Sequence, residues 1–250
     1  MKMVKEVDLF VPCFIDQIYP DTAESVVKIL ENLGIKVYYN TSQTCCGQAA
    51  FNGGHWDIAR ELAIKFLQDF PGNRNVVSPS ASCSAYVINY FPDLLENTIY
   101  MNNYRKLKPN MFELTDFLVN KIGITDLGAK FEAKVTIHDA CTALREYGLK
   151  DEPRSLLKKV DGLEIIEMEE SDTCCGFGGT FAIKHEAIST AMADQKAINA
   201  SNTGADYMVT TEASCMMHMD SYFKKQNLPI RCLHIADILV NFDQGKLFYD

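Results

Sequence analysis

Hydrophobic residues follow two alternating patterns along the first half of the chain. Short apolar runs, rich in β-branched and aromatic residues and typical of buried strands, occupy positions 6–11, 35–39 and 75–78. The segments between them repeat apolar residues every three to four positions, as one face of a helix does, at positions 21–33 and 56–70. The pattern predicts strands that alternate with helices, with Trp56 in the apolar core.

The second half repeats this order. Strands are predicted at 134–138, 163–167 and 207–210, with a long helix at 185–200. Residues 114–120 (LTDFLVN), near the end of the first half, match residues 235–241 (IADILVN) near the end of the second. The first half is longer by eleven residues before this closing helix. The polar stretch 102–110 holds the excess and is predicted to be a surface loop.

This repeat predicts two domains, residues 1–126 and residues 127–250. Because strands alternate with helices, each domain is expected to be a small, mostly parallel sheet with flanking helices. The predicted fold class is therefore α/β, with two tandem lobes related by a pseudo-twofold axis. In such sheets the ligand site lies outside the carboxyl ends of the strands.

Each half carries four cysteines at the same spacing, two of them adjacent and followed by glycine. The two quartets are Cys13, Cys45, Cys46 and Cys83, and Cys141, Cys174, Cys175 and Cys215. Equivalent cysteines are 128, 129, 129 and 132 positions apart. Each follows a predicted strand, so each quartet is expected to meet at one edge of its sheet. Four thiolates from three segments are the usual ligands of a metal ion or an iron–sulfur cluster.

A simpler interpretation is that the cysteines are thiols buried one at a time in two apolar cores. Such thiols have no reason to repeat one spacing or to form two Cys-Cys-Gly runs. The ninth cysteine, Cys232, belongs to neither quartet and is interpreted as an ordinary core thiol.

A glycine follows each adjacent pair, at Gly47 and Gly176. Glycine permits a positive φ and lets the backbone approach a ligand closely. In the second half the loop continues as Gly176-Phe177-Gly178-Gly179 before a helix. Its backbone N–H groups are expected to donate hydrogen bonds to cluster sulfides or to bind a small carboxylate.

The composition argues against several classes of function. The formal net charge is −9, so no basic stripe is available to neutralise nucleic-acid phosphates or to anchor the chain at a membrane surface. No stretch approaches the roughly 18 apolar residues of a transmembrane helix. A cytoplasmic location is expected, where clustered cysteines are more often metal ligands or redox thiols than disulfides. No glycine-rich flavin or nicotinamide fingerprint follows a predicted strand.

The cysteine pattern resembles the CCG cysteine-rich domain of heterodisulfide reductase and of the iron–sulfur subunits of glycolate and anaerobic glycerol-3-phosphate dehydrogenases. Over its whole length the chain is similar to the smaller lactate-utilisation protein A family of (Fe-S)-binding proteins. The segments that carry this resemblance are 44–48 (TCCGQ), 77–83 (VSPSASC), 113–120 (ELTDFLVN), 174–181 (CCGFGGTF) and 234–237 (HIAD).

The resemblance implies an iron–sulfur electron-transfer subunit of an oxidoreductase complex that oxidises L-lactate to pyruvate. The chain would be its non-flavin part and would work with other iron–sulfur and accessory subunits. Relatives in heterodisulfide reductase bind noncubane [4Fe-4S] clusters, and in some CCG proteins one copy holds zinc. The resemblance therefore implies a [4Fe-4S] cluster in the second half, whereas the first half is open to a cluster or zinc.

Both halves depart from the family pattern, which ends in Cys-x-x-Cys. The first copy ends in Tyr86 and the second in His218, so neither supplies a fifth thiolate. His218 is a candidate extra ligand, and an imidazole there would raise the potential of a cluster. His138, three residues before Cys141, is assigned to packing rather than to a supporting role at the site. The remaining histidines are expected on helix surfaces or interfaces; they are His55, His185 and His234.

Two other classes of function fit the same cysteines. A thiol–disulfide reductase would use one quartet to bind and reduce a substrate disulfide, and turnover of a small disulfide would identify it. An assembly scaffold would hold zinc in both quartets, and metal analysis would separate it from a redox protein.

Overall fold

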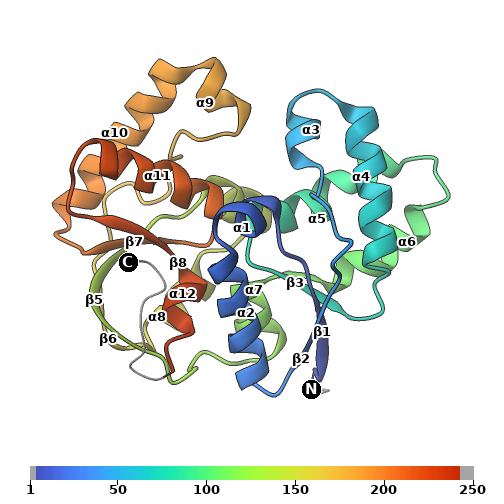
Figure 1. Ribbon diagram of the computed structural model, residues 1–250, viewed down its shortest axis with the longest axis horizontal. Coiled ribbons are helices and arrows are strands. Elements are labelled where there is room, and N and C mark those ends of the chain that lie inside the picture. The colour runs from blue at the N-terminus through green and yellow to red at the C-terminus, as the bar shows by residue number, and fades with distance from the viewer. Residues whose placement is uncertain (1–3, 243–250) are drawn as a thin grey trace. The chain divides into compact units, whose positions relative to one another are not determined.

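Each half of the chain folds around its own four-stranded sheet, in which all neighbouring strands are parallel (Figure 1). The computed structural model describes residues 4–242, and the chain divides into two units, Met1–Gly123 and Ile124–Asp250. The strand order is β2-β1-β3-β4 in the first unit and β6-β5-β7-β8 in the second. The α/β class, the two repeated lobes and the parallel sheets predicted from the sequence are confirmed.

The elements of the first unit alternate as the hydrophobic pattern requires. Its strands are β1 (Glu6–Leu9), β2 (Lys36–Tyr39), β3 (Asn75–Ser78) and β4 (Met111–Glu113). Its helical segments are α1 (Cys13–Ile18), α2 (Pro20–Asn32), α3 (Gln48–Asn52), α4 (Trp56–Asp69), α5 (Ala81–Leu95), α6 (Met101–Leu107), η1 (Lys108–Asn110), α7 (Leu114–Asp116) and η2 (Phe117–Lys121).

The second unit follows the same plan. Its strands are β5 (Lys130–Ile137), β6 (Asp161–Ile165), β7 (Tyr207–Thr210) and β8 (Arg231–His234). Its helical segments are η3 (Ala143–Tyr147), α8 (Asp151–Leu157), α9 (Thr180–Lys184), α10 (Glu186–Asn202), α11 (Ala213–Lys225) and α12 (Ile235–Leu239).

The strand order reverses at the centre of each sheet, between its two middle strands. From β1 the chain crosses to β2 on one side, and it then returns past β1 to β3 on the other. Because parallel crossovers are right-handed, α2 and α4 pack on opposite faces of the sheet. The loops after β1 and β3 therefore part from each other and leave a crevice at the carboxyl ends, where open α/β sheets bind ligands. In the second unit β5 and β7 have the same relation.

Three expectations about local structure are wrong. The stretch predicted as a surface loop forms α6 and η1, because Tyr104 and Leu107 turn into the core and are 4% and 0% exposed. Trp56 is not a core residue; it is 61% exposed and stacks on Phe51 at the surface. His234 lies at the end of β8 and is 0% exposed, so it is no surface residue.

Periodicity also missed α5, the helix that follows β3. Buried residues cover most of its circumference rather than one stripe; they are Ala81, Cys83, Ser84, Ala85, Tyr86, Val87, Phe91, Leu94 and Leu95. A helix that is buried nearly all round loses the period on which sequence reasoning depends.

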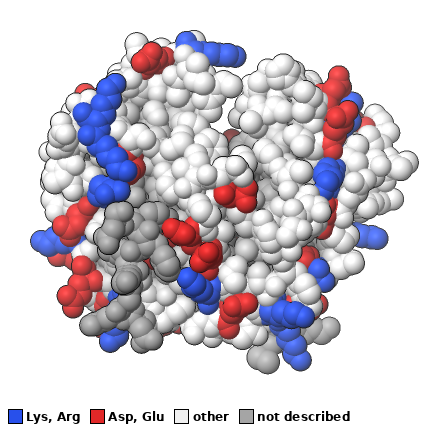
Figure 2. All heavy atoms as spheres, viewed as in Figure 1, with Lys and Arg blue, Asp and Glu red and all other residues white. Residues whose placement is uncertain are grey.

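Charged side chains are spread over the surface. On the face that Figure 2 presents, Lys and Arg side chains are interspersed with Asp and Glu. Among residues 4–242, no helix combines the length and the apolar character that a bilayer crossing requires.

A buried ionisable residue ends the fourth strand of each sheet and caps the helix that follows. The Glu113 carboxylate accepts hydrogen bonds from the N–H groups of Thr115 at 2.6 Å and Asp116 at 3.2 Å. The His234 Nδ1 atom accepts one from the Ala236 N–H at 3.2 Å. Both side chains are fully buried, and burial raises the pKa of Glu113 to about 8 despite the hydrogen bonds that favour its ionised form.

This raised pKa predicts how stability changes with pH. Between the ordinary pKa of glutamate, about 4.3, and the folded value, the folded chain binds more protons than the unfolded chain. The free energy of unfolding is therefore expected to fall as pH rises from about 5 to 8. Glu113→Gln removes this contribution, so urea unfolding of the variant should show a flatter pH dependence and higher stability at pH 8.

The control is Glu61→Gln, which changes an exposed glutamate of α4. It should keep the slope of the unmodified protein. If Glu113→Gln and Glu61→Gln give the same slope, Glu113 is ionised in the folded chain and burial does not dominate its pKa.

Candidate metal centre

The first quartet assembles at the carboxyl edge of the first sheet. Cys13 begins α1 after β1, Cys45 and Cys46 lie on the loop after β2, and Cys83 lies in the first turn of α5 after β3. The Sγ atoms of Cys46 and Cys83 are 3.4 Å apart. Cys45 is hydrogen-bonded to both Cys13 and Cys46. The four thiols thus form one continuous series, Cys13–Cys45–Cys46–Cys83.

The second quartet repeats this series at the edge of the second sheet. The Sγ atoms of Cys175 and Cys215 are 3.3 Å apart, and Cys174 is hydrogen-bonded to both Cys141 and Cys175. Cys215 lies in the first turn of α11, directly after β7. All eight cysteines singled out from the sequence therefore meet in their expected groups of four. The ninth, Cys232, is a buried thiol of β8.

The first two thiols of each series are more exposed than the last two. Cys13 is exposed, whereas Cys46 and Cys83 at the other end are buried. In the second quartet Cys141 is half-buried, and Cys175 and Cys215 are buried. Each group is thus a pocket of thiols that is open at the cysteine following the first strand and closed at the other end.

The thiols within each quartet strongly influence one another's ionisation. A hydrogen bond from Cys13, followed by one from Cys46, lowers the pKa of Cys45 to about 3. The same hydrogen bonds raise the pKa of Cys13 and of Cys46 well above the ordinary value. One thiolate can therefore exist by accepting hydrogen bonds from the S–H groups of its neighbours, but four adjacent thiolates repel one another unless a cation lies between them.

Ionisation in the second quartet follows the same rule. A hydrogen bond from Cys141 lowers the pKa of Cys174 to about 2, and one from Cys175 lowers that of Cys215 to about 5. Binding a metal with all four sulfurs would release the remaining protons, so affinity would rise with pH.

The glycine after each cysteine pair fixes the loop. Gly47 and Gly176 have φ values of +98° and +93°, which side chains rarely adopt. In this conformation each glycine N–H donates to the Sγ atom two residues earlier, at 3.4 Å to Cys45 and 3.4 Å to Cys174. A Cβ atom on Gly176 would lie 2.6 Å from the Ser189 carbonyl oxygen of α10. The loop therefore packs directly against the next helix.

The glycine-rich continuation of the second loop does not build an anion site. Gly178 and Gly179 also have positive φ values, and α9 begins directly after them. This helix has only five residues, too few for a substantial dipole at its N-terminus. Binding of a carboxylate there gains no support from this geometry.

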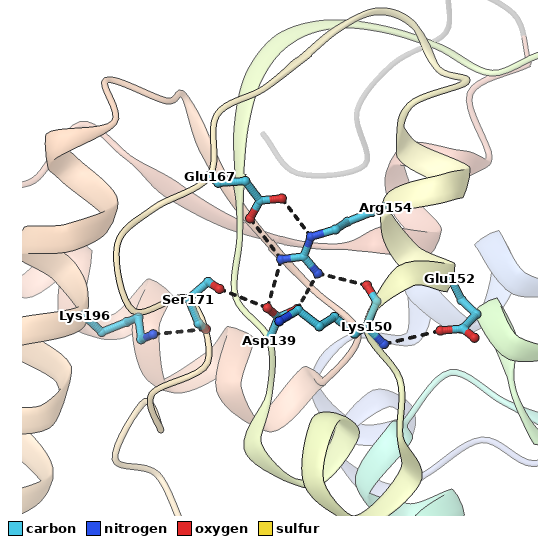
Figure 3. Close-up of polar contacts among 7 residues, drawn as sticks. All are labelled: Asp139, Lys150, Glu152, Arg154, Glu167, Ser171 and Lys196. Carbon is cyan, nitrogen blue, oxygen red and sulfur yellow. Dashed lines mark hydrogen bonds and ion pairs between the residues drawn. The ribbon is translucent and has the colours of Figure 1, made fainter.

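A buried ion pair holds the loop that leads to the second cysteine pair (Figure 3). The Arg154 guanidinium contacts the Asp139 carboxylate at 2.7 and 2.9 Å and the Glu167 carboxylate at 2.7 and 2.9 Å. The hydroxyl of Ser171 donates to Asp139 at 3.0 Å, and the Lys196 ammonium donates to the Ser171 carbonyl at 3.2 Å. This network ties α8 and α10 to the loop that precedes Cys174.

The residues in place of a fifth cysteine are aromatic in both units. The Tyr86 hydroxyl is buried without a hydrogen-bond partner, and burial followed by the neighbouring thiols raises its pKa. His218 is half-buried, packs against Phe177 with ring centroids 5.8 Å apart, and has a buried Nε2 atom without a partner. Burial lowers the pKa of His218, which keeps its ring neutral.

The imidazole that lies among the sulfurs is that of His138. Donor atoms of His138, Cys175 and Cys215 all lie within 4.8 Å of one another, and all three side chains are buried. His218 is not part of this group. Sequence reasoning assigned His138 to packing. Its position at the end of β5, three residues before Cys141, was the signal that could have placed it at the site.

These residues fit a metal ion or cluster held by thiolates. Each unit offers four soft sulfur donors from three segments, backbone N–H groups directed at sulfur, and a mostly buried pocket. The second unit adds an imidazole whose two nitrogens are buried, and its ring lies beside the Cys215 thiol. Buried polar atoms of this kind require a partner, and a metal ion is one.

A known family model and known proteins match both halves of the chain. The family model of the cysteine-rich domain, CCG, matches residues 7–87 and 135–220. Lactate utilization protein A of Halalkalibacterium halodurans is 36% identical over 234 residues, which cover 94% of this chain and 96% of that protein. The protein of the same name from Oceanobacillus iheyensis is 35% identical over 248 residues, covering 97% of this chain and 99% of that protein.

The fold and the two quartets thus define a protein with duplicated cysteine-rich domains of the CCG type. The chain belongs to the lactate utilization protein A family. A similar fold occurs in a hypothetical protein from Helicobacter pylori, with a TM-score of 0.66 and 12% identity. That similarity covers 97% of this chain and 50% of the other.

The two glycines after the cysteine pairs predict different sensitivities to substitution. Gly54→Ala, at φ +81° with no atom within 4 Å of the new Cβ, should cost about 1 kcal/mol for the left-handed backbone alone. Gly47→Ala should cost slightly more, because Leu62 lies 3.2 Å from the new atom. Gly176→Ala should cost roughly 2–4 kcal/mol, since backbone overlap adds to the strain. Urea unfolding tests this order, and equal losses for all three would contradict the packing argument.

The Arg154 network predicts a large single-mutant effect and partial recovery. Arg154→Leu leaves Asp139, whose side chain is 4% exposed, without its cation, and should cost roughly 3–5 kcal/mol. Asp139→Val added to Arg154→Leu should recover part of the loss, because valine stands at the equivalent position, Val11.

The control is Lys134→Ala, which breaks an exposed pair with Glu164 at 3.7 Å and should cost about 0–1 kcal/mol. Urea unfolding compares all three proteins. A double variant less stable than Arg154→Leu alone would show that the buried charges are not what makes the single change costly.

Proposed function

We propose that this chain is an iron–sulfur electron-transfer subunit of a multi-protein system that oxidises L-lactate to pyruvate. The observation that carries the proposal is the duplicated thiol series at the carboxyl edge of each sheet, with Sγ–Sγ distances of 3.4 and 3.3 Å at the buried ends. Relatives of about 35% identity over nearly the whole chain are named lactate utilization protein A. Their name supports lactate as the substrate of the whole system.

The chain's own residues would hold, orient and shield the redox group. Cys13, Cys45, Cys46 and Cys83 in the first unit, and Cys141, Cys174, Cys175 and Cys215 in the second, would supply the thiolates. A bound iron–sulfur cluster supplies one-electron chemistry. The N–H groups of Gly47 and Gly176 donate to sulfur, which stabilises thiolate charge. The buried cysteines of each series exclude water from one side of the pocket.

The surroundings of the two quartets favour different occupants. In the first unit, Cys46 and Cys83 belong to an apolar cluster that contains Phe10 and Phe66. An apolar pocket opposes changes of charge, so it suits zinc, whose charge is fixed. The four thiolates of the first unit could also hold a cluster. In the second unit the buried groups include Lys196: burial lowers its pKa, and a negative charge on Cys175 opposes this and favours the ammonium form. A nearby cation stabilises the added charge of a reduced cluster, so a [4Fe-4S] cluster is proposed for the second quartet.

Oxidation of lactate removes two electrons and two protons, and a cluster accepts one electron at a time. The chain has no glycine-rich fingerprint of a flavin or nicotinamide site. The step that takes hydrogen from lactate is therefore assigned to partner subunits, and transfer of electrons to this chain. A cytoplasmic location is proposed, because exposed thiols such as Cys13 stay reduced there.

A thiol–disulfide reductase is the second candidate, and one observation favours it. In each unit a cysteine of lowered pKa, Cys45 or Cys174, contacts a second thiol, as in dithiol reductants. Two such thiols can reduce a substrate disulfide to two thiols and form a disulfide themselves. The chain would then need an electron donor to regenerate them.

Metal analysis of anaerobically purified protein tests the main proposal. The unmodified chain should contain iron and acid-labile sulfide. Cys175→Ala should remove the iron and sulfide of the second quartet and leave the metal of the first, and Cys46→Ala should do the reverse, because the quartets are separate sites. Cys232→Ala changes a buried cysteine outside both quartets and should leave the metal content unchanged.

Other outcomes identify the alternatives. Zinc without iron or sulfide in both quartets would contradict an electron carrier and favour a scaffold. Metal-free protein that reduces a small disulfide, with loss of this activity in Cys175→Ala, would favour the thiol–disulfide reductase.

A further inference from the structure

The pocket walls behind the two quartets differ at two equivalent positions. Phe10 and His138 each stand three residues before the first cysteine of their quartet. Gly47 packs on the Ala59 carbonyl and Gly176 on the Ser189 carbonyl; seven residues farther along each helix stand Phe66 and Lys196. The first unit thus has two phenylalanines where the second has an imidazole and an ammonium group.

In the first unit this wall is purely apolar. The rings of Phe10 and Phe66 meet edge to face with centroids 4.8 Å apart, and Phe70 lies 5.7 Å from Phe10. An apolar ring therefore fills this position in the first unit, and packing does not require the nitrogens of an imidazole there. Burying a polar ring carries a desolvation cost that phenylalanine does not, so His138 in the same place is a poor choice for packing alone.

The His138 ring is sealed inside the second unit. It is 2% exposed, both of its nitrogens are buried, and its interaction with the Cys215 thiol helps to lower the pKa of that thiol. Its nearest ligating neighbours are the thiols of Cys175 and Cys215, with all donor atoms within 4.8 Å of one another. Thiolate and imidazole at this separation are a ligand combination that both iron and zinc accept.

We infer that His138 is a ligand of the metal or cluster in the second quartet, which makes this a mixed imidazole–thiolate site. The inference rests on the proposed function, because it names a further ligand of the same site. Neutral imidazole adds a donor without adding negative charge. The second site therefore differs from the first in ligand set, and His138 supplies a donor in place of the fifth thiolate that the chain lacks.

A metal-binding imidazole usually has its second nitrogen held by a hydrogen bond. A cavity of about 10 Å³ lined by His138 and Thr210 provides for this. It is close to the smallest volume that accommodates one water molecule. The Thr210 hydroxyl is buried without a partner, so one water can bridge it to the ring nitrogen that does not face the thiols.

X-ray absorption at the metal edge tests the inference directly, because a bound imidazole ring gives outer-shell scattering that thiolates lack. The measurement uses the full-length, anaerobically purified chain with Cys46→Ala and Cys83→Ala, so that only the second quartet holds metal. The expected spectrum contains one imidazole per site. His138→Phe, which installs the residue of the first unit, should lose this scattering while a thiolate signal remains.

His218→Phe is the matched control, since it changes the other histidine near this quartet and should leave the imidazole scattering intact. If His138→Phe does not fold, His138→Gln serves the same purpose, with circular dichroism to verify the fold. The spectrum of the protein with both histidines present shows by itself whether any imidazole binds the metal.

The outcomes separate this inference from the proposed function. Metal bound in the second quartet with thiolate scattering only overturns the role of His138 and leaves the proposed function standing. If His218→Phe loses the imidazole scattering and His138→Phe keeps it, the ligand is His218. This result also overturns the role of His138. Absence of metal from the second quartet overturns both.

Discussion

Mutual repulsion among four thiolates is the constraint on which both sites depend. Each fold unit brings the ends of three strands together, and each strand end delivers sulfur to one series of contacting thiols. Without a cation, only some of these sulfurs can be ionised at once. Hydrogen bonds from the neighbouring thiols determine which of them are ionised. The parallel sheet brings the sulfur atoms together, because the loops after its central strands open a crevice at one edge.

Duplication has preserved this frame while changing what surrounds it. The strand order, the glycine with a positive φ and the helix that carries the last cysteine in its first turn recur in both units. The wall behind the sulfurs does not recur, because an aromatic cluster in one unit is replaced by an imidazole, an ammonium group and a buried ion pair in the other. Two pockets of one geometry can therefore differ in the charge that they stabilise.

The sequence was informative wherever a feature had a period or a repeat. Strands with apolar runs, helices with one apolar face and the cysteine spacing led to the α/β class and to the eight thiols. A helix buried nearly all round, such as α5, has no such period and was missed. Tyr104 and Leu107 anchor a helix within a stretch whose polar composition suggested a loop.

The role of individual histidines was harder to predict. His138 and His234 are both buried, and only the place of His138 between a predicted strand and Cys141 pointed to the site. What places His138 beside sulfur is the pairing of β5 with β7, which brings residues more than seventy positions apart together. Contacts of this range depend on strand order, and strand order is not encoded in any short stretch of residues.

The gradual burial along each thiol series gives the site a direction. Incoming metal, dioxygen and alkylating reagents all meet the outermost sulfur first, at Cys13 or Cys141, and reach the two buried sulfurs of each series last. Damage in air should accordingly begin at the rim and spread inward. A partner that docks over the rim would protect the sulfurs and bring its own redox group to the side of the pocket where protein insulation is thinnest.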